Sequence, residues 1–235
     1  MWWVGSRPRD LYLGTGAVHI GDGRDVVLSG RVDGWEEGLA AALDFLSATP
    51  DRRRVRVWLS GRLCRPCLLP AIRALSDNEE KMKVAAALAG ESTGMGGEVH
   101  VWMEASGRAR TPLVVAADKH VLARLGEDAL GRPMASIRPW WSEVLNYSLT
   151  QPNIPMAVAV RDCDSLTVLA GRESDFLFAS TYFPPSGRDA AESAFVRAML
   201  SADVPPGPRR IWGLSSAAVE APADCALGAL MEHWS

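Results

Sequence analysis

The sequence predicts an α/β protein whose two halves share one order of elements: three strands, a helix and a returning strand. In the C-terminal half, three short apolar runs separated by turn residues indicate a meander of three strands, Met156–Val160, Ser165–Ala170 and Asp175–Thr181. A helix is expected over Gly187–Ala202, and a further strand over Arg209–Leu214. The element order of this half is therefore βββαβ.

The N-terminal half shows the same order, although no residue-level identity links the two halves. Three strands, a helix and a strand are expected over Asp10–Leu13, Ala17–Ile20, Asp25–Gly30, Trp35–Ala48 and Arg54–Leu59. Duplicated RNase H-like βββαβ halves, with an insertion in the first, make the actin-like fold. An unrelated α/β protein without a true repeat is the alternative.

The first helix and the strand after it carry two further signals. Asp33 is expected to be the N-cap of the helix, with Glu36 three residues on, and Pro50 ends the helix. A short basic cluster, Arg52–Arg54 with Arg56, follows. It predicts either contact with an acidic partner or membrane headgroups, or a solvated turn with outward-facing arginines.

An inserted α+β subdomain is expected within the first half, over about residues 61–135. Its expected elements are an extended segment at Arg62–Pro70, a helix from Ser76 to about Gly90, strands at Val99–Met103 and Pro112–Ala117, and a helix capped by Asp118 that closes near Gly131. A strand at Met134–Ile137 and a helix at Trp140–Leu149 then complete the half. Because Gln151–Pro155 is typical of a linker, the predicted lobes are 1–150 and 151–235.

Composition excludes several classes of protein. A hydrophobic fraction of 48% and a charged fraction of 23% are ordinary for a globular protein, so disorder is not expected. The net charge of -3 gives no nucleic-acid footprint. No apolar run approaches the roughly 20 residues of a membrane span, and the first residues do not form a signal peptide. A soluble, intracellular protein is expected.

The spacing of Cys64 and Cys67 is that of a redox pair or half of a zinc site. A redox pair needs a helix that opens at the cysteines, whereas Pro70 follows closely here. A zinc site needs two more ligands, and the histidines are scattered. The sequence therefore favours two ordinary thiols in a half-buried strand, and no metal site is predicted.

The middle of the chain resembles the actin-like cytoplasmic proteins of bacterial type IV pilus and type II secretion machines, the PilM and GspL group. Val57–Pro70, with its Leu-Ser, Arg and Leu-Leu-Pro positions, is similar to a strand pair of that group. The helix that begins with Ser76–Glu80 follows as in the group. Leu113–Asp118 resembles its Ala-x-Asp step and Ile137–Trp140 its Val-x-Pro step. The succession covers roughly residues 10 to 215.

The resemblance implies a cytoplasmic docking protein at the inner face of the bacterial inner membrane. Its partner would be the cytoplasmic segment of an inner-membrane pilus or secretion protein, and association with the membrane would come only through partners. A homodimer is left open, and no nucleic acid is expected. Secretion-type members continue into a transmembrane helix. Because this chain stops at Ser235, it is either a truncated member or a wholly soluble one.

An actin-like nucleotide site needs two phosphate hairpins, each with an acid in the first strand and glycine in the turn. The first turn is Gly14-Thr15-Gly16, which predicts a vestigial phosphate hairpin, but Tyr12 or Leu13 takes the place of the acid. The second turn, Asp162–Ser165, has acids and no glycine, so that its backbone cannot approach a phosphate closely. The last strand retains one glycine, Gly213.

These losses predict a pseudo-ATPase with no catalytic residues, for which ATP is not an expected cofactor although residual binding is left open. The alternative is an ATP-binding, kinase-like phosphotransferase of the same superfamily, for which Asp162 or Asp164 would hold magnesium. Trp140 and Trp141 lie on two faces of one helix, so one of them is the candidate exposed anchor for a partner, unless both pack between the lobes. The tail is expected to form a helix capped by Asp224.

Overall fold

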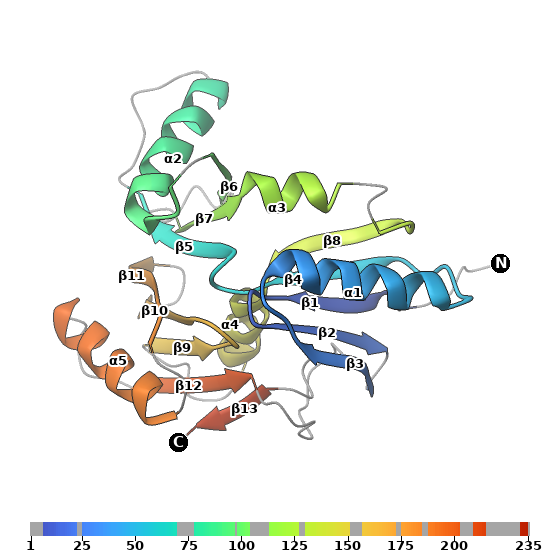
Figure 1. Ribbon diagram of the computed structural model, residues 1–235. Coiled ribbons are helices and arrows are strands. Elements are labelled where there is room, and N and C mark those ends of the chain that lie inside the picture. Colours follow the sequence, from blue (N-terminus) through green and yellow to red (C-terminus); the bar gives the residue numbers. More distant parts are fainter. Residues whose placement is uncertain are drawn as a thin grey trace.

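The computed structural model describes residues 7–22, 25–69, 78–96, 98–103, 113–126, 130–150, 157–172, 175–184, 188–202, 209–214 and 231–234. These residues form two five-stranded sheets and one three-stranded sheet (Figure 1). Among them, no helix is long and apolar enough to cross a membrane.

The first sheet has the strand order β3-β2-β1-β4-β8. Its strands are β1 (Arg9–Leu13), β2 (Ala17–Asp22), β3 (Asp25–Arg31), β4 (Val55–Leu59) and β8 (Met134–Pro139). The first three form an antiparallel meander, whereas β4 and β8 run parallel to β1. Helix α1 (Trp35–Ala48) covers one face, because its apolar stripe packs on the alternating apolar residues of β1, β2 and β4.

The second sheet repeats this arrangement in the order β11-β10-β9-β12-β13. Its strands are β9 (Ala157–Arg161), β10 (Leu166–Arg172), β11 (Asp175–Tyr182), β12 (Arg209–Leu214) and β13 (Met231–Trp234), and α5 (Arg188–Ser201) packs on it. The predicted helix at the C-terminus is wrong over Met231–Trp234, which pairs with β12 as a strand. The proposed cap, Asp224, lies outside the described residues.

The inserted segment forms a separate antiparallel sheet in the order β5-β7-β6. Its elements are β5 (Cys64–Leu68), α2 (Asn78–Thr93), β6 (Val99–Met103), β7 (Leu113–Asp118) and α3 (Lys119–Arg124). Helix α2 packs against this sheet. Helix α4 (Trp140–Thr150) follows β8 and leads to the second lobe (Figure 1).

The ends of two helices differ from the sequence predictions. Gly34, with φ of 124°, is the N-cap of α1, and no side chain caps the helix. Asp33 instead donates its backbone N–H to the carboxylate of Glu37 at 2.6 Å, because the chain turns into the helix one residue later than predicted. Asp118 is confirmed as the cap of α3, with its carboxylate accepting from the N–H of His120 at 2.7 Å. Helix α3 ends at Arg124 rather than near Gly131.

The cysteine pair is two separate buried thiols, as the sequence favours. Cys64 packs in the core beneath α1 and Cys67 in the core beneath α2, so the two side chains lie on opposite faces of β5. Burial raises the pKa of both thiols, that of Cys67 to about 11. Two thiols on opposite faces of a strand suit neither a redox pair nor a zinc half-site.

A third core lies between the lobes and explains the tryptophan pair. It combines residues of the first lobe, such as Tyr12 and Trp58, with residues of the second, such as Val160. Trp140 and Trp141 are 1% and 2% exposed within it, so the prediction that one is an exposed anchor is wrong. Trp140 packs edge-on against Tyr12 and Trp58, and the indole N–H of Trp141 donates to the carbonyl of Cys64 at 2.9 Å, so both belong to the core between the lobes, which was the alternative interpretation.

Candidate functional site at the junction of the lobes

Two hairpins at equivalent positions in the two halves meet at the junction of the lobes. The first, between β1 and β2, turns at Gly14-Thr15-Gly16 and is closed by a hydrogen bond from the N–H of Gly14 to the carbonyl of Ala17, 3.0 Å. The second, between β9 and β10, turns at Asp162–Ser165. The predicted vestigial hairpin is thus brought against the second turn, 149 residues further along the chain.

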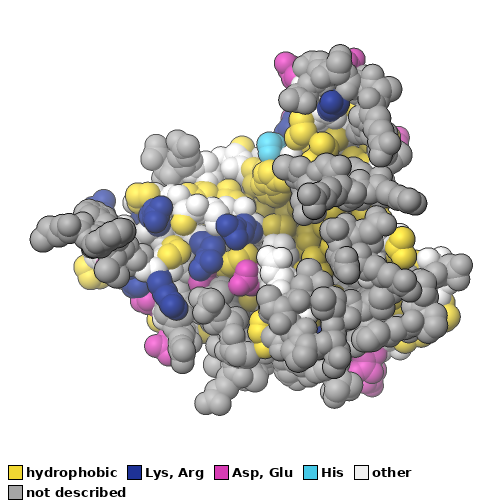
Figure 2. Space-filling view, turned by 180° about the vertical axis from the view of Figure 1, so that it is seen from behind, with side chains coloured by type: hydrophobic (Ala, Val, Ile, Leu, Met, Phe, Trp, Pro, Cys, Tyr) yellow, Lys and Arg dark blue, Asp and Glu magenta, His cyan; other side chains and the backbone are white. Residues whose placement is uncertain are grey.

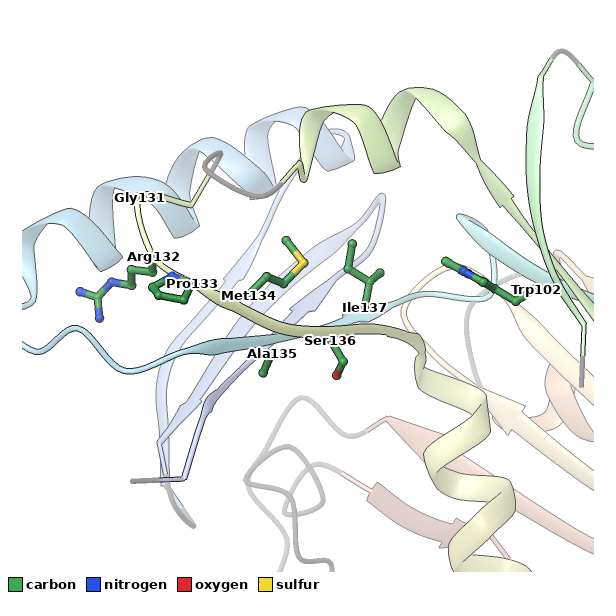
Figure 3. A pocket seen from close by; sticks show the side chains of 8 residues that line it. All are labelled: Trp102, Gly131, Arg132, Pro133, Met134, Ala135, Ser136 and Ile137. Atoms are coloured by element: carbon green, nitrogen blue, oxygen red, sulfur yellow. The ribbon is translucent and has the colours of Figure 1, made fainter. Parts of the chain in front are cut away.

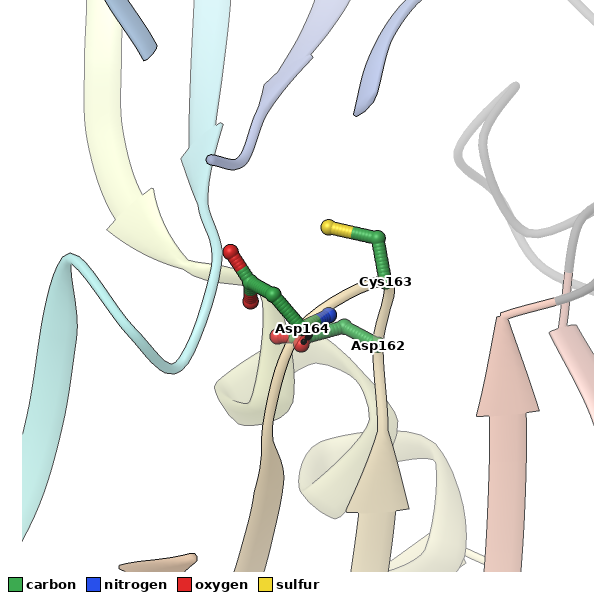
Figure 4. A group of neighbouring side chains, drawn as sticks. All are labelled: Asp162, Cys163 and Asp164. Atoms are coloured by element: carbon green, nitrogen blue, oxygen red, sulfur yellow. Dashed lines mark hydrogen bonds between the residues drawn. The ribbon is translucent and has the colours of Figure 1, made fainter. Parts of the chain in front are cut away.

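The Asp164 carboxylate binds the donors of the first hairpin. One of its oxygens accepts a hydrogen bond from the backbone N–H of Thr15 at 2.9 Å and another from the Thr15 hydroxyl. Figure 4 shows Asp164 at the tip of the β9–β10 hairpin, with its carboxylate directed away from these two strands. A carboxylate of the protein therefore holds the turn donors that could otherwise hold an anion.

Asp162 makes a second link between the lobes. Its buried carboxylate accepts from the N–H of Gly61, in the loop after β4, at 2.7 Å, and from the N–H and hydroxyl of Ser165 at 2.9 and 2.7 Å. Burial, and then the charge of Asp164, raise the pKa of Asp162 to about 7. Gly61 permits this approach, because a Cβ there would lie 2.5 Å from the hydroxyl oxygen of Thr167.

Tyr12 stands where the acid of an actin-like site is expected. Its hydroxyl lies 3.1 Å from the sulfur of Cys163, whereas the neighbouring Leu13 points into the core beneath α1. Burial and the nearby acids raise the pKa of Tyr12 well above its ordinary value. A Cβ at Gly14 would lie 2.6 Å from the Cys163 sulfur, so the two turns are in direct contact.

The second hairpin offers candidate magnesium ligands, and the buried Oδ1 of Asp164 has no hydrogen-bond partner among the described residues. Ligand atoms of Asp162, Cys163 and Asp164 lie within 4.8 Å of one another, but both carboxylate oxygens of Asp162 already accept hydrogen bonds from N–H groups. A phosphate bound by the donors of the first turn would have to displace the Asp164 carboxylate from Thr15.

The sequence did not show that the hairpins close on each other. It indicated that the second turn has acids and no glycine, but a contact between Asp164 and Thr15 depends on how two distant halves pack. The sequence feature that comes closest to indicating this contact is the Ser60-Gly61 turn after β4, where the backbone N–H of Gly61 reaches Asp162. In the last strand, Trp212 is buried against Tyr147, with ring centroids 5.3 Å apart.

A groove beside the inserted sheet is the other candidate site. Its volume is about 710 Å³, and it is lined by Trp102 of β6 and by residues Gly131–Ile137. The lining includes most of β8, which is an edge strand of the first sheet. Figure 3 shows the side chains of Met134 and Ile137 on one side of β8, with Trp102 beyond them, while Ala135 and Ser136 point to the other side.

Comparisons with solved structures identify the class of fold. A Bacteroides thetaiotaomicron protein with an actin-like ATPase fold and unknown function is similar, with a TM-score of 0.58 and 11% identity over 90% of this chain and 83% of that one. This likeness shows that the chain has the actin-like ATPase fold, as the sequence predicts. It shows the fold alone.

Two further solved structures belong to the group that the sequence resembles. The cytoplasmic domain of EpsL, an inner-membrane component of the type II secretion system of Vibrio cholerae, has a TM-score of 0.48 and 18% identity, over 74% of this chain and 70% of that one. The PilM-PilN type IV pilus biogenesis complex has a TM-score of 0.48 and 15% identity, over 83% and 68%. No family profile and no curated protein matches the sequence.

Proposed function

We propose that the protein is a non-catalytic actin-like scaffold that docks a component of a bacterial inner-membrane assembly platform. The observation that carries this proposal is the direct bonding of the two phosphate-type hairpins, with the Asp164 carboxylate on the donors of Thr15. These bonds and the apolar core behind them hold the lobes together without a nucleotide. A body closed in this way can present fixed surfaces to a partner.

The groove along β8 is the docking site that we propose for this partner. An edge strand offers unpaired backbone groups, and an extended segment can add to it as a further strand. Met134, Ile137 and Trp102 would contact every second side chain of that segment. Pro133 precedes β8 and Pro139 is its last residue, and neither has an N–H, so the segment would pair over about five residues, roughly 17 Å.

The resemblance in the sequence supplies the class of partner. We infer a type IV pilus or type II secretion machine, and the partner is then a cytoplasmic segment of one of its inner-membrane proteins. The protein would be cytoplasmic and peripheral to the inner membrane. This assignment is drawn from the motifs around Val57–Pro70 and Leu113–Asp118, and not from the looser structural likenesses.

Two measurements test the proposal together. Melting with and without about 1 mM Mg-ATP should give the same midpoint, whereas a ligand at 100 times its Kd adds roughly 2.7 kcal/mol of stability. Titration with cytoplasmic segments of pilus and secretion inner-membrane proteins should show binding that Trp102→Ala weakens. Leu177→Ala is the control, because it removes an exposed apolar side chain of β11 outside the groove. Absence of binding to every such segment would refute the scaffold.

A phosphotransferase is the competing function, and the cluster of Asp162, Cys163 and Asp164 is the observation in its favour. If it were right, the purified protein would transfer phosphate from Mg-ATP, and changing both aspartates to Asn would abolish that turnover. Turnover in the unaltered protein would overturn the proposed scaffold, because that scaffold is non-catalytic and its hairpins bind each other instead of a nucleotide.

A further inference from the structure

The end of the first sheet furthest from the lobe junction is rich in arginine. Strands β1, β4 and β8 run parallel, so their first residues lie at one end of the sheet. The basic end is defined by the arginines at or just before these strand starts: Arg7, Arg9, Arg52, Arg53, Arg54 and Arg132. The described aspartates nearby are Asp22, Asp25 and Asp51, so this end has three excess positive charges in a chain of net charge -3. Figure 2 shows basic side chains gathered on one face of the first lobe, which contains this sheet.

Three of the arginines are engaged by two aspartates. Arg53 contacts Asp22 at 2.6 Å, and Arg9 and Arg132 contact Asp51 at 2.8 and 2.9 Å. Hydrogen bonds from Arg53 are the main reason why the pKa of Asp51 is held well below its ordinary value. Arg9 is 5% exposed, its guanidinium carbon lies 5.9 Å from the centroid of the Phe45 ring, and among the described residues its buried Nε and Nη1 have no hydrogen-bond partner. These three arginines are therefore committed to the fold rather than to a ligand.

The other three arginines, Arg7, Arg52 and Arg54, are exposed, and no ion pair to any of them is found within the described ranges. Beside them is a recess of about 370 Å³ between the end of α1 and the start of β8. Its polar lining includes Arg52 and the Asp51 carboxylate, and Arg132 there already donates to Asp51 and to the carbonyls of Leu46 and Thr49. The exposed arginines around the recess, rather than the recess itself, are therefore the groups that can meet an anionic surface.

We propose that the basic end binds the anionic surface of a phospholipid bilayer through the exposed Arg7, Arg52 and Arg54. These three precede the neighbouring strands β1 and β4 and so spread over an end of the lobe, as a planar charged surface requires; an acidic peptide would need them along one groove. In this orientation the lobe junction and second lobe point away from the bilayer (Figure 1). Arg132 is shared with the docking groove, but Arg7, Arg52 and Arg54 do not line it, so this proposal does not depend on the proposed function.

The test is flotation of the purified protein with vesicles. Phosphatidylcholine vesicles with about 30% phosphatidylglycerol should bind the protein at low salt and release it at about 0.5 M NaCl, where the Debye length is only a few Å. Each arginine near such a surface is worth about a fivefold change in partitioning. The double variant Arg52→Gln with Arg54→Gln should therefore bind roughly 30-fold more weakly. The control is Arg124→Gln with Arg197→Gln, which removes the same charge from exposed positions on α3 and α5.

The outcomes separate this proposal from the proposed function. Anionic-specific binding that the control keeps and the test variant loses supports the basic end. No binding, equal binding to pure phosphatidylcholine, or equal loss in both variants overturns it, as does binding to polyglutamate but not to vesicles. In titrations without lipid, the affinity for a partner segment should be the same for both variants. Failure of the lipid proposal would therefore leave the docking function untouched.

Discussion

Replacing Asp164 with Ala tests whether the hairpin contact holds the lobes together. The change removes the acceptor of two hydrogen bonds, from the N–H and the hydroxyl of Thr15, and leaves that N–H unpaired. Hydrogen bonds to a charged group contribute about 1.5 to 3 kcal/mol each, and Asp164 is only partly buried. We therefore expect the free energy of unfolding to fall by about 2 to 3 kcal/mol in total. For a chain of this size, that lowers the melting midpoint by roughly 5 to 10 °C.

The assay is urea unfolding, with variants that separate the two bonds. Asp164→Asn keeps an acceptor without the charge and should lose about half as much. The double-mutant cycle of Asp164→Ala with Thr15→Ala should show a coupling energy of about 1 kcal/mol, the share of the hydroxyl. Asp44→Ala, an exposed carboxylate on α1, should change stability by less than about 0.5 kcal/mol. If Asp164→Ala were as mild as Asp44→Ala and the coupling were zero, the hairpin contact would not hold the lobes.

Three further predictions concern other residues of the two lobes. Gly14→Ala should lower the free energy of unfolding by about 1 to 3 kcal/mol, because its Cβ would meet the Cys163 sulfur. The Cβ of Gly16→Ala would meet nothing within 4 Å, so this variant should be neutral or stabilising. Equal urea midpoints for the two variants would contradict this prediction. The raised pKa of Asp162 makes stability fall as pH rises from about 4 to 7, and the pKa of His19, lowered by burial to about 4, makes stability rise from about 4 to 6.5. The free energy of unfolding of the unaltered protein should thus change little between about pH 4 and 6.5, whereas that of Asp162→Asn should rise towards about pH 6.5. Parallel plots of this free energy against pH for the two proteins would count against the prediction. Arg132→Ala should cost about 3 kcal/mol by thermal melting, because its buried guanidinium donates to the last carbonyls of α1; a loss below about 1 kcal/mol would mean that this cap is dispensable.

Most of the fold was predictable because local patterns agree with it. The alternation in β4 and the apolar stripe of α1 report which faces are buried, and both elements form where the sequence indicates. The misjudged start of α1 has a local cause, since Gly34 adopts a positive φ that the capping rule for Asp33 does not consider. Strand β13 was missed because a strand at an edge is set by its neighbour β12 rather than by its own pattern.

The candidate site was predictable only in part. The glycine turn at Gly14–Gly16 and the altered second turn were visible in the sequence, and the structure places them together. The bond between Thr15 and Asp164 was not, because it depends on the packing of two halves. The burial of Trp140 and Trp141 likewise depends on residues far away in the chain, such as Tyr12, Trp58 and Cys64, which contact the two indoles.

The apolar core between the lobes also determines how the protein can move. Four indole rings, those of Trp58, Trp140, Trp141 and Trp212, are at most 9% exposed there. A buried tryptophan removes about 150–250 Å² from water, which is worth roughly 4 to 6 kcal/mol. If parting the lobes exposed half of this area in the four rings, it would cost about 8 to 12 kcal/mol, as much as the whole stability of a typical domain. We therefore expect the lobes to part only when the chain unfolds, and tryptophan emission should then record a single transition.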